Sequence, residues 1–305
     1  GRLWEGSQRR PFWQGGIMGI EGVKVEKTEK GVVCIDFEAS GPNWEQWVLL
    51  SSDRHHDNAK CKWDLELKHL RQAKERNALI CDFGDLMCLM QGKWDRRADL
   101  SQCRPEHQEG RYIDSVISTA VDFFSPYADN WAFCSPGNHE TSILKHHETD
   151  PTARFVEGMR NAGASSLVQG DYAGFIRFRA VRADRKSSRL VLGYHHGYGG
   201  GGPVTKGTIQ TNRMSTYLPD CNLVVSGHVH EKWALQIDRS RLNHVGKPYI
   251  DRQVHLKIPG YKDEYSSFNG WHIERGGTPK PLGAWWLKFA LGEDERLDFE
   301  FMEAK

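Results

Sequence analysis

The sequence predicts an α/β fold whose C-terminal part is rich in β-strands. Short apolar runs alternate with stretches whose apolar residues recur at helical spacing, which is the pattern of α/β proteins. From residue 233 onward the pattern changes, because the runs WALQID, QVHLKI, AWWLKFAL and LDFEF are typical of strands and no helical pattern separates them. We therefore expect a mixed, β-rich layer at the C-terminal end of the chain.

Five apolar runs are expected to form buried strands, and each of them ends in polar residues. They are residues 47–50, 78–81, 131–134, 190–192 and 223–225. Two stretches, 61–76 and 111–124, are expected to be amphipathic helices, because their apolar residues recur at intervals of three and four. Residues 145–163 are expected to form a surface insertion near the cleft, and we do not assign their His146 and His147 to a metal.

Composition places the chain among ordinary globular proteins and gives no electrostatic sign of its partners. Of the 305 residues, 38% are hydrophobic and 27% are charged, with a net charge of +1. This charge offers no argument for nucleic acid or for a membrane surface, although a local cleft can still hold a nucleic acid. Residues 1–22 are rich in Gly, Arg and Trp without periodicity, so we expect an N-terminal arm followed by a single domain over 23–305.

Two features favour a cytoplasmic protein that does not enter a membrane. No apolar run approaches the ~18 residues of a membrane span, and the N-terminal segment lacks the apolar core of a signal peptide. The seven cysteines are odd in number and form no CxxC pair. We interpret them as buried thiols in a reducing compartment and not as a disulfide framework.

Five polar clusters follow the five expected strands directly. They are Asp53-Arg54-His55, Gly84-Asp85, Gly137-Asn138-His139-Glu140, His195-His196 and His228-Val229-His230. The carboxyl ends of strands in an open α/β sheet line the ligand crevice, so these clusters should meet at one edge. In the last cluster both histidine rings would face the same side, because side-chain direction alternates with period two. Asp, His and Asn together suit Mn, Fe or Zn better than Ca or Mg, so we predict a transition-metal site.

In order and spacing, the series D-x-H, G-D, G-N-H-E, H, G-H-x-H resembles the calcineurin-like metallophosphoesterases over roughly residues 47–232. This resemblance implies a two-layered mixed β-sandwich flanked by α-helices, with a binuclear centre for two divalent transition-metal ions, Mn favoured over Fe or Zn. By resemblance, the first metal would be bound by Asp53, His55, Asp85 and His230, and the second by Asp85, Asn138, His195 and His228. A bridging carboxylate such as Asp85 would offset the repulsion of two cations about 3.5–4 Å apart.

The fourth cluster contains two candidates for one ligand position. His195 and His196 cannot both face the metal, because neighbouring side chains on an extended segment point to opposite sides. The family commonly uses the histidine directly after the strand, and this favours His195. His56 and Asp57, beside the first cluster, are interpreted as supporting or surface groups and not as ligands.

Further roles are assigned to the residues between the ligands. By resemblance, His139 would protonate the leaving oxygen or stabilise the phosphoryl charge. Arg54 is expected to contact the substrate phosphate because it is covalently tied to two ligands, and Asn138 is expected to contact the substrate as well. Many relatives carry an orienting Asp three residues after the G-D pair, where this chain has Cys88. Asp95 and Glu140 are the candidates to replace that carboxylate.

Three weaker signals receive a structural interpretation or stay open. The glycine-rich run 197–207 is expected to be a flexible loop over the site and not a phosphate cradle. The tryptophans of 284–286 and 270–271 are expected to lie in the core and not to stack a base. The basic residues Lys93, Arg96 and Arg97 could equally contact phosphate or belong to a solvated loop.

The function implied by the resemblance is metal-dependent hydrolysis of phosphate esters by a metal-bound hydroxide. We rank phosphodiesters of nucleotide or nucleic-acid type first as substrates. Phosphomonoesters, including phosphoproteins, are the alternative: the G-N-H-E form also occurs in protein phosphatases, but the G-D segment lacks the Asp-Arg-Gly expected there. A non-catalytic scaffold on the same fold ranks lower, because every ligand type is present, and an interaction protein with incidental histidines ranks lowest.

Overall fold

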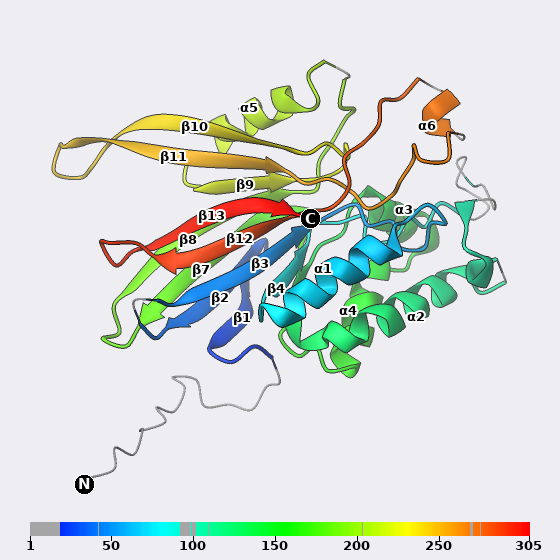
Figure 1. The fold of residues 1–305 in the computed structure, drawn as a ribbon, viewed down its shortest axis with the longest axis horizontal. Coiled ribbons are helices and arrows are strands. Elements are labelled where there is room, and N and C mark those ends of the chain that lie inside the picture. The colour runs from blue at the N-terminus through cyan, green and yellow to red at the C-terminus, as the bar shows by residue number, and fades with distance from the viewer. Residues whose placement is uncertain are drawn as a thin grey trace, which may run out of the picture.

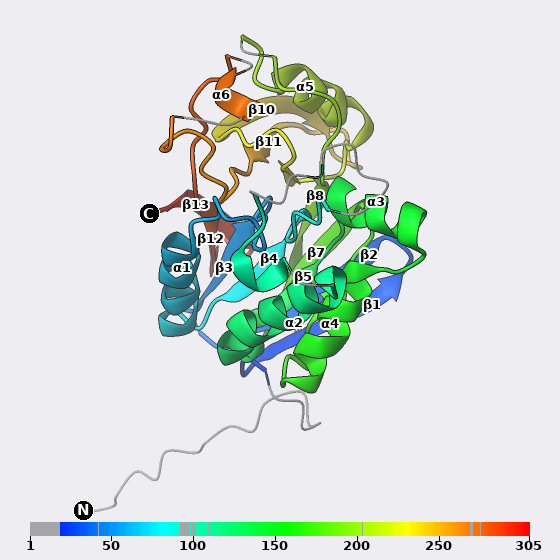
Figure 2. The same cartoon turned by 90° about the vertical axis from the view of Figure 1, so that its right-hand side faces the viewer.

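The computed structural model describes residues 19–305 except 42, 92–97, 99–101, 109, 203, 269–270 and 275. Two mixed β-sheets pack face to face, and helices cover their outer faces (Figures 1 and 2). The predicted α/β class and its two-layered sandwich are confirmed. None of the helices in the described part of the chain is long and apolar enough to cross a membrane.

The first sheet has seven strands in the order β1-β2-β7-β8-β9-β11-β10. Their bounds are Val23–Glu29 (β1), Val32–Ala39 (β2), Ala173–Arg182 (β7), Ser187–His195 (β8), Leu223–Ser226 (β9), Trp233–Leu242 (β10) and Pro248–Lys257 (β11). Strand β9 lies parallel to both β8 and β11, whereas β10 and β11 form a long antiparallel hairpin.

The second sheet has six strands in the order β13-β12-β3-β4-β5-β6. Their bounds are Glu45–Ser51 (β3), Leu79–Asp82 (β4), Trp131–Cys134 (β5), Val168–Gln169 (β6), Ala284–Leu291 (β12) and Leu297–Ala304 (β13). Strands β3 to β6 are parallel, so the loops after β3, β4 and β5 emerge at one edge. The two C-terminal strands extend this sheet in antiparallel pairing.

Helices pack mainly against the outer face of the second sheet. Their bounds are Trp63–Glu75 (α1), Tyr112–Phe124 (α2), Asn138–His147 (α3), Pro151–Asn161 (α4), Thr208–Tyr217 (α5) and Trp271–Glu274 (α6), with short 3₁₀ helices at Pro105–His107 and Ser125–Asn130. Leu70 of α1 and Val116 of α2 share a buried cluster with Ile80 of β4. Helix α5 covers the other sheet, where Met214 packs on Val224.

The hydrophobic core between the sheets explains why the apolar runs form strands. Ile35, Val48, Leu50 and Phe178 are all at most 1% exposed in this layer. Trp285 and Trp286 are buried in β12, as expected, whereas residues 269–270 and the side chain of Trp271 lie outside the described part. All seven cysteines are buried and none forms a disulfide, which agrees with their interpretation as buried thiols.

Two expectations about organisation need correction. Residues 145–163 are not a surface insertion, since most of them form α4 and the end of α3, and Phe155 and Met159 of α4 are buried against the second sheet. The expected arm 1–22 lies outside the described residues up to residue 18, but Ile20 is only 7% exposed and packs into the core between the sheets. Strands β1 and β2, which follow it, carried no prediction.

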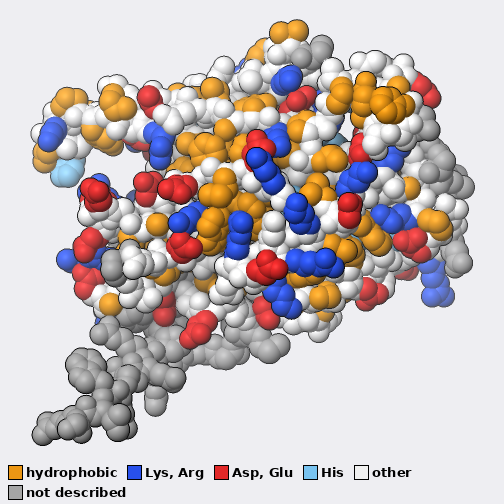
Figure 3. Space-filling view, viewed as in Figure 1, with side chains coloured by type: hydrophobic (Ala, Val, Ile, Leu, Met, Phe, Trp, Pro, Cys, Tyr) orange, Lys and Arg blue, Asp and Glu red, His pale blue; other side chains and the backbone are white. Residues whose placement is uncertain are grey.

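The surface shows no single-sign charge field on the face in view. Figure 3 shows Lys and Arg interspersed with Asp and Glu over the strands and helices of this face. This mixture agrees with the net charge of +1.

Candidate metal centre

Five loops bring the polar clusters together at one end of the sandwich. The loops follow β3, β4 and β5 of one sheet and β8 and β9 of the other. Direct hydrogen bonds join them: the backbone N–H of His228 donates to Oδ2 of Asp53 at 2.8 Å, and the backbone N–H of Asp53 donates to the carbonyl of Gly84 at 2.8 Å. The predicted convergence of strand ends is therefore present.

Asp53, His55 and His230 form the first group of possible metal ligands. One ligand atom from each lies within 4.8 Å of the other two. Nε2 of His230 is 3.3 Å from Oδ1 of Asp53 and 3.2 Å from Nε2 of His55. Oxygen and nitrogen atoms that converge in this way suit a divalent transition metal.

Asp85, His196 and His228 form the second group, again with ligand atoms within 4.8 Å of one another. Nε2 of His196 lies 3.2 Å from Oδ2 of Asp85. Oδ1 of Asn138 lies 2.7 Å from Nδ1 of His228 and 3.2 Å from Nε2 of His196, so this amide oxygen joins the group.

The choice of His195 needs correction, because the structure brings His196 to the second group. His196 is fully buried, and its Nδ1 lies 2.8 Å from the carbonyl of Phe83. That contact fixes Nδ1 as the protonated nitrogen and leaves the lone pair of Nε2 for a cation, as is usual for metal-bound histidines. His195 is the last residue of β8 and faces the other side, where its Nδ1 accepts the backbone N–H of Gly197 at 2.9 Å.

Electrostatics keep both carboxylates ionised. Burial alone would raise the pKa of Asp53, but the imidazole of His230 outweighs it and holds that pKa well below its usual range. Burial would also raise the pKa of Asp85, but the imidazole of His196 outweighs burial and holds that pKa below its usual range. Burial lowers the pKa of His196, but Asp85 outweighs it and raises that pKa to about 10. Without a cation His196 therefore stays protonated at neutral pH, and a divalent cation beside the two carboxylates would displace the proton from its Nε2.

The backbone at the ligands adopts the left-handed conformation that most residues avoid. The φ angles are 52° at Asp53, 48° at His55, 53° at Asp85, 73° at His228 and 52° at His230. Each such residue stores strain that surrounding contacts must hold, and this kind of strain clusters at functional sites. The strained backbone at these five ligands therefore supports a functional site in these loops.

Glycines let the loops approach each other closely. A Cβ on Gly227 would overlap Oγ of Ser52 and the carboxylate of Asp53. A Cβ on Gly137 would overlap the carboxylate of Asp85 in the same way. The glycine before each of these histidine motifs is therefore required by the packing of the ligands.

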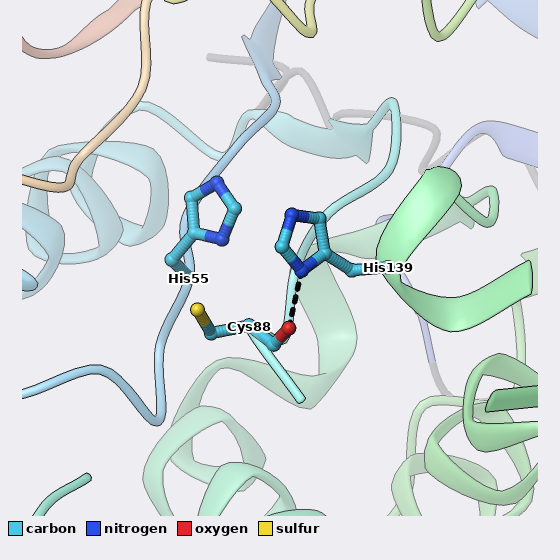
Figure 4. Close-up of side chains that lie close together, drawn as sticks. All are labelled: His55, Cys88 and His139. Atoms are coloured by element: carbon cyan, nitrogen blue, oxygen red, sulfur yellow. Dashed lines mark hydrogen bonds between the residues drawn. The ribbon is translucent and has the colours of Figure 1, made fainter. Parts of the chain in front are cut away.

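His139 lies beside both groups at the start of α3. Its backbone N–H donates to Oδ1 of Asp85 at 2.9 Å, and its Nε2 is 3.7 Å from Oδ2 of the same carboxylate. Its Nδ1 makes a short hydrogen bond with the backbone carbonyl of Cys88, drawn as the dashed line in Figure 4. A main-chain carbonyl thus orients this ring in place of the carboxylate that many relatives use.

Glu140, one of the two candidates for the orienting carboxylate, does not have that role. Glu140 instead accepts the backbone N–H groups of Asp85 at 3.1 Å, Met87 at 3.0 Å and Gly137 at 2.8 Å. It ties the second and third motifs together and does not contact the ring of His139. Asp95, like Lys93, Arg96 and Arg97, lies outside the described residues.

The expected phosphate contact of Arg54 is wrong. Its side chain is 0% exposed, and its Nε donates to Oδ2 of Asp82 at 2.8 Å while Nη1 donates to Oε1 of Glu66 at 3.2 Å. Asp53 and His55 face the site, whereas the side chain of Arg54 between them turns into the interior. Arg54 holds the loop after β3 to the protein interior and cannot reach a substrate.

His56 and Asp57 support the loop from within. His56 is fully buried with its Nδ1 2.8 Å from Oε2 of Glu66. The carboxylate of Asp57 accepts the backbone N–H of Leu89 at 3.0 Å and the hydroxyl of Tyr112 at 2.9 Å. Neither residue belongs to the first or the second group, but His56 forms a separate buried group of possible ligands with Cys61 and Glu66. Neither His56 nor Asp57 lies at the surface.

No family model matches the chain, and no curated protein matches it. Among solved structures, the chain is similar to Vps29 from Entamoeba histolytica complexed with zinc, at 10% identity over 85% of this chain and 99% of that one, with a TM-score of 0.35. It is similar to GAP50 of Plasmodium at 10% identity over 86% and 85% of the two chains, with a TM-score of 0.43. A putative 5'-nucleotidase from Staphylococcus aureus shows 11% identity over 84% of this chain and 53% of its own, with a TM-score of 0.44.

Likenesses this distant establish no activity and no ligand for the chain. Its own sheets and loops carry more weight: two mixed sheets flanked by helices, with five motifs in order at their strand ends. In fold and in the order of its motifs, the chain resembles the calcineurin-like metallophosphoesterases.

Proposed function

We propose that this protein is a metal-dependent hydrolase of phosphate esters with a binuclear centre. The observation that carries the proposal is the pair of neighbouring ligand groups, each with its atoms within 4.8 Å of one another. The proposed ligands are Asp53, His55, Asp85 and His230 for one cation, and Asp85, Asn138, His196 and His228 for the other, with Asp85 shared. His196 thus takes the place first given to His195.

The residues present fit two transition-metal cations. Both carboxylates are held as anions, and burial keeps the pKa of His55 well below its usual range, so this ring is neutral and able to bind. The donors are oxygen and nitrogen with no sulfur, which is compatible with Mn, Fe or Zn, and Mn remains our first choice. When bound, such a pair would activate water and polarise the phosphoryl group.

His139 is proposed to hand a proton to the leaving oxygen. Its Nδ1 donates to the Cys88 carbonyl, so Nε2 is the atom that faces the shared carboxylate of Asp85. The ring is about nine-tenths buried, which keeps bulk water from competing for that proton. General acid catalysis of this kind typically contributes a factor of ~10²–10⁴ in rate.

Phosphodiesters of nucleotide or nucleic-acid type are the proposed substrates, with phosphomonoesters second. A monoester carries a second negative charge, and Arg54, the cation expected to meet it, is turned into the protein. This removes one argument for a monoester. The mixed surface charge in Figure 3 gives no separate support for a long nucleic acid.

An activity screen tests the proposal. Protein reconstituted with Mn²⁺ should hydrolyse bis-p-nitrophenyl phosphate faster than p-nitrophenyl phosphate, and cyclic nucleotides and DNA should be tried beside them. Chelator should abolish the activity, and so should Asp85→Asn, whereas Asp294→Asn, an exposed control, should leave it unchanged. Two bound metals with no turnover of any ester would contradict hydrolysis and favour a scaffold.

A further inference from the structure

A third group of possible ligands overlaps the proposed centre and is unlike the other two. His55 from the loop after β3, Cys88 from the loop after β4 and His139 from α3 bring one ligand atom each within 4.8 Å of one another. All three are buried, at 3%, 3% and 9% exposed. Figure 4 shows the two rings and the thiol around one shared space.

Nδ1 of His55 is a buried nitrogen available to bind a ligand. Nδ1 of His55 is sealed from solvent and has no hydrogen-bond partner among the described residues. The other nitrogen, Nε2, is the one that lies 3.2 Å from His230 in the first group. Buried polar atoms are rarely left without a partner, so this Nδ1 calls for a ligand.

The sulfur of Cys88 adds a selectivity that the two groups of the proposed centre lack. Neither the first nor the second group contains a cysteine. A thiolate with two imidazoles favours thiophilic cations such as Zn²⁺ and Cd²⁺ over Mn²⁺. Burial and the nearby Asp57 raise the pKa of the Cys88 thiol to about 12, so the sulfur keeps its hydrogen until a cation displaces it. Nδ2 of Asn58 donates to this sulfur at 3.4 Å.

We propose that His55, Cys88 and His139 form an inhibitory site for a thiophilic divalent cation. Binding exchanges one proton, because the Cys88 thiol gives up its hydrogen to solvent as the sulfur–metal bond forms. The binding itself is independent of any activity, whereas the inhibition rests on the proposed function.

Inhibition follows from the atoms that the cation would occupy. A neutral imidazole has one lone pair, so His55 bound through Nδ1 is withdrawn from the group with Asp53 and His230. His139 bound to a cation can no longer donate a proton to a leaving group. The same protein would thus be activated by Mn²⁺ at the two oxygen–nitrogen groups and inhibited by a thiophilic cation such as Cd²⁺ at the sulfur.

Cadmium titration of the Mn²⁺-loaded protein tests the site directly. One equivalent of Cd²⁺ should produce the ultraviolet absorption of a cadmium–thiolate bond in the wild-type protein. Cys88→Ser should abolish this absorption, and Cys34→Ser, a buried thiol in β2, should keep it. The Cd²⁺ concentration that halves each variant's own starting activity should rise about tenfold or more in Cys88→Ser alone.

X-ray absorption of cadmium in the wild-type protein supplies a second readout that no variant's folding can disturb. We expect one sulfur together with nitrogen neighbours in the first shell. A shell of oxygen and nitrogen only, or a thiolate band that survives in Cys88→Ser, would overturn the site. A cadmium–sulfur bond at Cys88 in a protein that hydrolyses no ester would support the site while the proposed function fails.

Discussion

Nε2 of His196 lies 3.2 Å from Oδ2 of Asp85, while the ring of the adjacent His195 accepts the backbone N–H of Gly197 and faces away. One residue of register in β8 thus decides which histidine can bind. The hydrogen bond from Nδ1 of His196 to the carbonyl of Phe83 holds the His196 ring in this orientation.

Replacement of His196 should remove the second metal. His196→Ala deletes a ligand, so we expect one metal per chain in place of two and most of the activity lost. His195→Ala is the matched control and should keep both metals. Elemental analysis of the two purified variants checks this, and metal loss in His195→Ala alone would show that the register is different.

Replacement of His139 should lower the rate without loss of metal. In our proposal this ring acts on the leaving group and binds neither activating cation. His139→Ala should therefore slow hydrolysis of an ester with a poor leaving group by ~10²–10⁴-fold. The loss should be smaller with p-nitrophenyl esters, whose leaving group needs little protonation. An equal loss with both substrates would point to a charge-stabilising role, and loss of metal would make the residue structural.

Much of the site could be predicted from the sequence because strand ends meet at one edge of a sheet. The order of Asp53, Asp85, Asn138 and His228 along the chain needs no long-range information beyond that rule. The direction of the Arg54 side chain could not be predicted in this way, because its neighbours in sequence face the site. Its partners Asp82 and Glu66 come from other elements. Sequence proximity to a ligand proved a poor guide to exposure.

Other features depend on contacts that a sequence pattern does not show. The orienting group of His139 is a main-chain carbonyl, which any residue at position 88 supplies. The exact end of β8 decides between neighbouring histidines, and element ends are the least certain part of any pattern. Strand β2 pairs with β1 on one side and with β7, which is distant in sequence, on the other, and this pairing holds both N-terminal strands in the sheet.

Removal of Arg54 should destabilise the fold. Arg54→Ala leaves the carboxylates of Asp82 and Glu66 buried without their cation, a change that costs about 3–5 kcal/mol in the free energy of unfolding. Urea unfolding followed by circular dichroism measures this. The exposed Arg296→Ala is the control and should leave the midpoint nearly unchanged. A stable Arg54→Ala protein with weakened substrate binding would restore the phosphate contact that we exclude.

Stability should fall in mild acid partly because of His255. Burial and the nearby Arg239 lower the pKa of this ring to about 4, below its unfolded value near 6.5. As the pH falls from ~6.5 towards ~4, the unfolded chain binds a proton that the folded chain refuses, so stability drops by about 1.4 kcal/mol per pH unit. Above pH ~6.5 the contribution is complete.

His255→Phe should remove this slope when its unfolding free energy is compared with that of the wild-type protein at each pH. The other buried histidines titrate in both proteins and cancel in the difference. His244→Gln, on the exposed tip of the β10–β11 hairpin, should keep the wild-type slope. A difference between wild type and His255→Phe that does not change between pH 7 and 4 would contradict the assignment.

Anomalous X-ray scattering from crystals grown with Mn²⁺ tests the binuclear centre most directly. We expect two manganese peaks about 3.5–4 Å apart, one beside Asp53, His55 and His230 and the other beside Asn138, His196 and His228, with the carboxylate of Asp85 between them. A single peak, or none after soaking at a saturating concentration of Mn²⁺, would contradict a binuclear centre.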